Sequence, residues 1–346
     1  MPVPAFLHAV GTACPPHDVH QDFLAYAPAL LASERERALF ARMAERSGIA
    51  HRFSPLTAAE GFYVPGAFPS TAARMRRYAA ESLPLALAAL AELGRKLGRD
   101  WREGVTHLIL VSCTGFEAPG LDQRLIAAAG LDPRLERTVV GFMGCNAAFH
   151  ALKLARHIVR SEPASRVLVL NLELCTLHFQ ETASLEQALC FMLFADGCSA
   201  ALVGAEPRGL ELERFRQETL PDGEDLITWR IGDDGFDMRL SGQVPGAILR
   251  HLPAHLRALD APGAALWAIH PGGRSILDAV QLALELPEAA MAPSRAVLHD
   301  HGNMSSATVM FVLARLLAAA GQGRRGVALG FGPGVGVESL AFREAG

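Results

Sequence analysis

The chain has 346 residues, with 32 Lys and Arg against 36 Asp and Glu and an apolar share of 50%. This length and apolarity predict a large buried core in one or two domains and exclude a disordered protein. The net charge is −4, whereas general nucleic-acid-binding proteins carry an excess of basic residues, so this class of protein is disfavoured. Six cysteines without a CxxC pair argue against a disulfide scaffold and structural zinc. We therefore expect reduced thiols, no metal and a cytoplasmic protein.

The first eight residues form an apolar run without a basic region in front of it, which predicts a short first strand and not a signal peptide. The longest apolar helical stretch, 307–320, contains Arg315 and is too short to span a bilayer. No integral membrane association is expected.

Matching segments indicate an internal duplication. The apolar strands at 105–115 and 265–273 each end in glycine and precede a helix with an apolar stripe. Matching Cys113 with His270 gives an offset of 157 residues between them.

A second pair of segments supports the same duplication. Two helices open at Gly-Cys145-Asn and Gly-Asn303-Met, and matching Cys145 with Asn303 gives an offset of 158 residues. The buried strands that begin at Arg166 and Gly326 match with an offset of 160 residues. Near-equal offsets predict two related halves, 1–205 and 206–346.

Short, continuously apolar strands alternate with helices in both halves. Strands of this kind are covered on both faces, so we expect an α/β fold with layered sheets around buried central helices. Asp196-Gly197 and the Asp233-Asp234-Gly235 segment are predicted as turns.

Cys145 is the most informative cysteine. It follows a strand-like segment and opens a helix, where unpaired N–H groups and the helix dipole favour a thiolate. His270 ends a central strand, and Asn303 opens the helix that matches the one after Cys145. If the halves are related by a pseudo-twofold axis, a thiol, an imidazole and an amide meet at one place. Each residue alone has a simpler interpretation: a packed thiol, a core histidine and a helix cap.

Six segments carry a resemblance to a known family: VSCTGFEAPGLD, GFMGCNAAFHALKLA, LFADGCSAALV, WAIHPGGRSILD, HGNMSSATVMF and GFGPGVGVE. In these segments, from about Phe40 to Glu338, the sequence resembles the type III polyketide synthases, the chalcone and stilbene synthase group. The resemblance implies a thiolase-like fold with α-β-α-β-α layers. It also implies that Cys145 is the acyl-accepting nucleophile and that His270 and Asn303 complete its triad.

The resemblance further implies the reaction. Cys145 takes an acyl group from a coenzyme A thioester, and malonyl-CoA loses carbon dioxide to give an enolate that attacks the acyl-thioester. Repeated extension and cyclisation then yield a pyrone or a phenolic product. Acyl-CoA and malonyl-CoA are the expected substrates, no cofactor is expected, and the protein is expected to be a homodimer.

Departures from the plant members of the family lie in the expected substrate pocket. Cys113, Cys175 and His178 stand where plant members have threonines, and Met238 replaces a frequent gatekeeping Phe. Cys113 is typical of the bacterial branch. Ala118 stands where many relatives have a Met that reaches into the partner subunit's cavity. A smaller residue there leaves room for a longer chain, but the large Trp229 side chain can fill that room again. The expected pocket also includes Phe194, next to the triad, and Ser305.

The segment from Phe40 to Gly48 matches the family's CoA-binding helix. It places Arg42 and Arg46 four residues apart on one helix face, where they can contact phosphates. Leu39 replaces a third basic residue of the family, so a solvated charged face is the competing interpretation.

Three alternatives remain open at this point. A ketoacyl-carrier-protein synthase of the third class uses the same Cys, His and Asn, but its His and Gly-rich segments differ from HPGGRSILD and GFGPG. A papain-like thiol hydrolase shares the order of the three residues but has a different cysteine context. The third alternative is a catalytically silent partner protein with a thiolase fold.

Overall fold

A nine-stranded sheet is the largest element of the computed structural model, which describes residues 3–97 and 101–345. The strands lie in the order β11-β12-β13-β8-β1-β7-β6-β4-β5. Their bounds are β1 Phe6–Ala13, β4 His107–Ser112, β5 Glu136–Gly141, β6 Val167–Leu174, β7 Asp196–Gly204, β8 Leu210–Thr219, β11 Leu266–Ile269, β12 Arg325–Gly332 and β13 Gly336–Glu344.

The strand arrangement repeats across the sheet. β4 is parallel to β6, and β6 and β1 both run antiparallel to β7. In the same order, β11 is parallel to β12, while β12 and β8 run antiparallel to β13. Two residue pairs, Phe6 with Glu211 and Leu7 with Leu210, join β1 to β8 and so connect the two parts of the sheet. The repeat confirms the prediction of two related halves.

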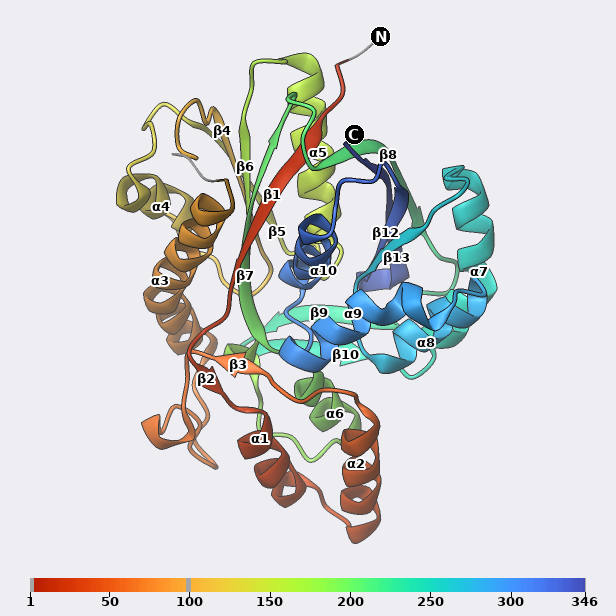
Figure 1. Ribbon diagram of the computed structural model, residues 1–346. Coiled ribbons are helices and arrows are strands. Elements are labelled where there is room, and N and C mark those ends of the chain that lie inside the picture. The colour runs from red at the N-terminus through yellow and green to blue at the C-terminus, as the bar shows by residue number, and fades with distance from the viewer. Residues whose placement is uncertain (1–2, 98–100, 346) are drawn as a thin grey trace.

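Helices complete a five-layered arrangement (Figure 1). Helices α3 and α4 cover the outer face of the β1-β7-β6-β4 part, whereas α7, α8 and α9 cover the outer face of the β8-β13-β12-β11 part. Helices α5 and α10 lie between the two parts. This α-β-α-β-α order confirms the predicted fold class. The helices span α3 Thr71–Leu97, α4 Leu121–Ala129, α5 Ala147–Ser161, α7 Val244–Leu259, α8 Arg274–Ala283, α9 Glu288–His301 and α10 Ser306–Ala318.

Small residues allow the layers to pack closely. Ala147, Ala148, Ala151 and Ala155 on α5 are all fully buried. On β1, a Cβ atom at Gly11 would lie 2.3 Å from a backbone nitrogen of α3, so only glycine allows this strand and helix to touch. The small-residue positions therefore fix how near the central helix and the outer helix come to the strands.

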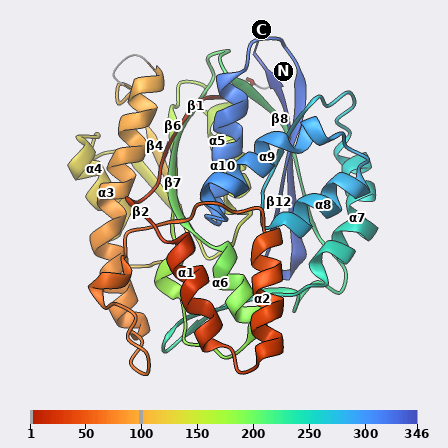
Figure 2. The same ribbon diagram turned by 60° about the horizontal axis from the view of Figure 1, so that its bottom comes forward.

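A group of N-terminal helices lies beside α6 at one end of the molecule (Figure 2). Helix α2 begins with a capping box, in which Ser33 and Glu36 satisfy each other's backbone N–H groups. The remaining elements are β2 His17–Asp18, α1 His20–Tyr26, η1 Ala27–Leu30, α2 Glu34–Arg46, β3 Phe53–Ser54, η2 Ala58–Glu60, η3 Cys175–His178, α6 Leu185–Leu193, β9 Ile227–Gly232, β10 Gly235–Leu240 and η4 Pro333–Val335.

The local predictions have mixed outcomes. The first strand is confirmed as β1, and Asp233-Asp234 form the turn of the β9–β10 hairpin. The predicted turn at Asp196-Gly197 is wrong, because these residues begin β7 and are fully buried. Hydrogen bonds from Thr176 satisfy the Asp196 carboxyl there, which allows an acidic residue inside a strand. Within the described ranges, no helix is both long and apolar enough to cross a bilayer.

Candidate active site

Cys145 lies in the tight turn between β5 and α5. Asn146 is the N-cap of α5, so Cys145 lies one residue before the cap and not at the first helical position that the sequence predicted. The turn needs glycine at position 144, because the backbone has φ +84° and a Cβ there would lie 2.2 Å from Pro333. The turn thus fixes Cys145 near the unpaired N–H groups of the helix N-terminus.

His270 directly follows β11 and has only 1% of its surface exposed. Its backbone N–H donates to the Leu329 carbonyl at 2.8 Å, which extends the β11–β12 pairing to this residue. Within the described part of the chain, neither ring nitrogen has a hydrogen-bond partner. Buried polar atoms of this kind call for a functional explanation.

Asn303 lies between α9 and α10. Its side-chain carbonyl accepts from the Ser305 backbone at 2.9 Å, and its amide donates to the Gly272 carbonyl at 3.3 Å. Ser305 has a φ of +49°, which is uncommon for a residue with a side chain. These contacts orient the Asn303 side-chain amide just before the N-terminus of α10.

One cavity of about 40 Å³ brings the three residues together, as the internal duplication predicts. Its wall combines both halves of the chain. Among its lining residues are Cys145, Phe194, Trp229, Met238, His270, Asn303 and Ser305.

Burial controls the protonation of the two ionisable groups. It raises the pKa of the Cys145 thiol to about 11, although hydrogen bonds from Ser305 and Asn303 act in the opposite direction. It lowers the pKa of His270 to about 3. Each group alone is therefore neutral at pH 7.

A small apolar cluster packs against Cys145. Its buried members are Cys175, Cys190, Phe194 and Met238. Met238 on β10 lies opposite Trp229 on β9, and the Trp229 and Phe194 rings meet edge to face at 6.1 Å. The predicted pocket residues Cys175, Phe194, Met238 and Trp229 thus lie around the nucleophile.

His178 is not among the residues that line the cavity, but its ring lies 6.2 Å from that of Trp229, which is. Its Nε2–H donates to the Thr114 carbonyl at 2.7 Å, and its Nδ1 accepts from the Phe236 backbone at 3.2 Å. The ring stacks on Phe236 at 3.9 Å, and burial lowers its pKa to about 3. His178 is therefore a neutral residue of fixed orientation.

Cys113 lies at the end of β4, where its sulfur accepts from the Gly144 backbone at 3.1 Å. Its own backbone N–H donates to Glu173, a fully buried carboxyl that also accepts from Thr114 and Ser306. Burial raises the pKa of Glu173 to about 7. Cys113 is thus adjacent to the turn that carries Cys145.

Three more predicted residues, like Cys113 and His178, are not among the residues that line the cavity. Ala118 is exposed in the loop between β4 and α4, at a cis peptide bond to Pro119. Arg42 and Arg46 are exposed on α2, and the Arg46 carbonyl accepts from Arg274 at 3.1 Å. Among the described residues, no group of three or more His, Cys, Asp or Glu is placed to hold a metal ion.

A second, larger cavity of about 270 Å³ lies between α1, β3 and α6. Phe194 and Cys175 belong both to its lining and to the apolar cluster at Cys145, so these two side chains stand between the larger cavity and Cys145. Five further aromatic side chains line it: Phe23, Tyr26, Tyr63, Phe179 and Phe191.

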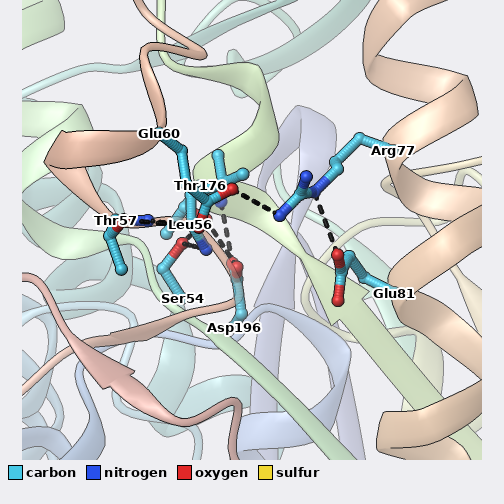
Figure 3. Close-up of polar contacts among 8 residues, drawn as sticks. All are labelled: Ser54, Leu56, Thr57, Glu60, Arg77, Glu81, Thr176 and Asp196. Atoms are coloured by element: carbon cyan, nitrogen blue, oxygen red, sulfur yellow. Dashed lines mark hydrogen bonds and ion pairs between the residues drawn. The ribbon is translucent and has the colours of Figure 1, made fainter.

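Polar contacts fix one wall of this second cavity (Figure 3). Asp196 accepts from the backbone and the hydroxyl of Thr176, and the Thr176 hydroxyl lies 2.8 Å from that of Ser54. Nearby, Arg77 forms ion pairs with both Glu60 and Glu81.

The sequence reasoning did not identify the buried polar residues behind the site. Glu173 interrupts the apolar strand VLVLNLEL, and this lone carboxyl was an available signal. Arg52 gave no such signal, because its hydrogen-bond acceptors come from distant segments.

Comparisons with known proteins agree with this geometry. The family models for the N-terminal and C-terminal domains of chalcone and stilbene synthases match residues 2–207 and 211–345. Bisdemethoxycurcumin synthase from rice (Oryza sativa subsp. japonica) is 32% identical over 367 residues, covering 96% of this chain and 90% of the relative.

Solved structures share the whole fold. PKS-I from the brown alga Ectocarpus siliculosus has 28% identity and a TM-score of 0.89, with 99% of each chain covered. The C-terminal type III polyketide synthase domain of Steely1 from Dictyostelium has a TM-score of 0.91 at 24% identity, over 99% of this chain and 100% of that one. The matched family models and the curated relative together establish that the chain belongs to the chalcone and stilbene synthase family of type III polyketide synthases, which are acyltransferases.

Proposed function

We propose that Cys145 accepts the starter acyl group from acyl-CoA and that the enzyme extends it with malonyl-CoA. The observation that carries this proposal is the cavity in which Cys145, His270 and Asn303 converge from both halves of the chain. The thiol proton passes to His270, the Cys145 thiolate attacks the thioester carbon, and the CoA thiolate leaves and takes the proton from the imidazolium.

His270 and Asn303 then act on malonyl-CoA. Loss of carbon dioxide leaves the electron pair of the broken C–C bond as an enolate, whose negative charge develops on the thioester oxygen. The Nε2–H of His270, whose ring nitrogens have no other partner in the described structure, and the amide of Asn303 donate hydrogen bonds to that oxygen. Phe194 keeps the surroundings apolar, which favours loss of the charged carboxylate.

The larger cavity gives the acyl chain room to extend. The catalytic cavity of about 40 Å³ is much smaller than the neighbouring one of about 270 Å³. We propose that the distal part of the starter or of the growing chain enters the aromatic cavity between Cys175 and Phe194. This arrangement favours an extended apolar acyl group.

We propose that Arg42 and Arg46 bind the CoA phosphates and that the enzyme needs no cofactor beyond its CoA substrates. Both arginines are exposed on α2, the helix that Arg274 links to α8. Their exposure suits a contact with phosphates in solvent.

A homodimer completes the proposal. Strand β5 is the last strand of the sheet, and Val139 on it is 51% exposed beside the exposed Met143 and Phe116. A second copy on this edge would cover these side chains and bring Ala118 toward the partner's cavity.

We place the division between the halves at 205/206, after β7, and we assign the chain to the bacterial branch because of Cys113. The six free cysteines support a cytoplasmic location.

The test combines malonyl-CoA with short aliphatic, long aliphatic and aromatic acyl-CoA starters, followed by mass spectrometry of the products. Radiolabel from acyl-CoA is expected on wild-type protein and not on Cys145→Ala. Polyketide products formed only when malonyl-carrier protein replaces malonyl-CoA, or hydrolysis without any malonyl-CoA, would overturn the proposal.

A further inference from the structure

Arg52 lies between α2 and β3 and is only 2% exposed. Its Nε–H donates to His20 Nδ1 at 2.9 Å, and its Nη1–H groups donate to the carbonyls of Phe191 at 2.8 Å and Phe194 at 2.7 Å. The guanidinium carbon lies 4.8 Å from the centre of the Phe23 ring. A buried charge whose hydrogen bonds go to neutral acceptors is costly to keep, so a role beyond packing is expected.

The segment that Arg52 holds is also the support of Asn303. Phe194 and Asn303 form an isolated parallel bridge. The Asn303 N–H donates to the Leu193 carbonyl at 2.8 Å, and the Ala195 N–H donates to the Asn303 carbonyl at 2.9 Å. Arg52 therefore fixes the segment that contains Phe194, and this segment pairs through its backbone with Asn303, whose side-chain amide is the candidate catalytic group.

A second contact joins Arg52 to the same place. Gly302, which precedes Asn303, has a φ of +66°, and a Cβ there would lie 2.9 Å from Arg52 Cγ. The stem of Arg52 thus packs directly against the backbone at Gly302, while its guanidinium orients Phe194. Both contacts act on the backbone that places Asn303. Arg52 also lines the larger cavity proposed for the acyl chain, so its positioning effect is best measured with malonyl-CoA alone.

We propose that Arg52 is a positioning residue that sets the placement of Asn303, through the backbone at residues 193–195, for the decarboxylation of malonyl-CoA. This inference rests on the proposed function. Lysine cannot replace arginine here, because a single ammonium has no planar fork that spans two carbonyls and an imidazole.

Arg74 provides a matched control. It is fully buried on α3, lies over the Tyr63 ring at 5.5 Å and donates to the carbonyls of Leu177 and Phe179. Its environment is thus like that of Arg52, but the segment it holds carries His178 and not Asn303. Arg74→Lys should disturb packing to a similar degree without moving the catalytic amide.

The experiment measures malonyl-CoA decarboxylation without a starter. Arg52→Lys is expected to lower kcat about 10- to 100-fold with KM changed less than about 3-fold, and Arg74→Lys to lower kcat less than about 3-fold. In an Asn303→Ala background, Arg52→Lys should cause less than about a 3-fold further loss, because the positioned group is absent. Equal losses in both backgrounds, or an unchanged kcat, would overturn the proposal.

Two controls separate the possible failures. If the wild-type protein does not decarboxylate malonyl-CoA, the proposed function fails, and if Asn303→Ala equals wild type, the role of Asn303 fails. Circular dichroism establishes that each variant is folded. Should Arg52→Lys not fold, His20→Leu removes only the Nε acceptor. A smaller kcat loss that disappears in the Asn303→Ala background then supports the proposal, and no loss overturns it.

Discussion

Replacing His270 with glutamine should strongly slow alkylation of Cys145. Burial, opposed by hydrogen bonds from Ser305 and Asn303, leaves the thiol with a pKa of about 11 when no imidazolium stands beside it. At pH 8 such a thiol is only about 0.1% thiolate. A neighbouring imidazolium lowers cysteine pKa values to about 3.5–7.5, which makes the wild-type thiol mostly thiolate at the same pH. The expected loss in His270→Gln is therefore about 100- to 1,000-fold.

The assay is timed labelling with iodoacetamide from pH 5 to 9, with mass spectrometry of the peptide that contains Cys145. The wild-type rate should level off below pH 8, whereas the rate for His270→Gln should rise about tenfold per pH unit up to pH 9. His178→Gln is the control, since His178 is a similarly buried imidazole that bonds to Thr114 and Phe236. Identical rates and profiles for wild type and His270→Gln would refute the pairing of Cys145 with His270.

Three further predictions concern stability, assembly and chain length. Burial raises the pKa of Glu338 from 4.5 to about 7, so the stabilisation from its protonated form is present below pH 4.5 and lost as pH rises through 7. Urea unfolding should show wild type losing about 3 kcal/mol relative to Glu338→Gln across that range. Val139→Glu, a charge on the exposed β5 edge, should give monomers in sedimentation. Cys175→Phe, which closes the route to the larger cavity, should abolish products from long acyl-CoA starters and retain those from short ones in the mass-spectrometric assay.

The duplication explains why so much of the fold was predictable. Each half repeats the same strands and helices, so equal offsets in sequence translate into equivalent positions in space. The juxtaposition of Cys145 with Asn303 follows from this symmetry, because α5 and α10 open at matching places between the two parts of the sheet. His270 joins them because β11 ends beside β12 in the same layer.

Residues that act through long-range backbone contacts were not predictable. Asp196-Gly197 has the composition of a turn, and pairing with Leu174 and Glu173 of β6 makes it the start of β7. Arg52 finds its acceptors about 140 residues away, at Phe191 and Phe194, where no local pattern indicates a partner. Periodicity reports which face of an element is buried, but not which distant carbonyl meets a guanidinium.

Glu173 shows how the two halves are joined at the site. One carboxyl oxygen accepts from Cys113 and Thr114, at the end of β4, and the other accepts from Ser306, at the start of α10. The carboxyl therefore fixes the end of β4 relative to α10, the helix that follows Asn303. At that end of β4, the Cys113 sulfur accepts from the backbone N–H of Gly144, the residue before Cys145. A negative charge on it would raise the pKa of the Cys145 thiol. Its own raised pKa, near 7, leaves about half of the carboxyl protonated at pH 7, which reduces that opposition without removing it. One buried residue thus holds the halves in register while its charge state affects the thiol.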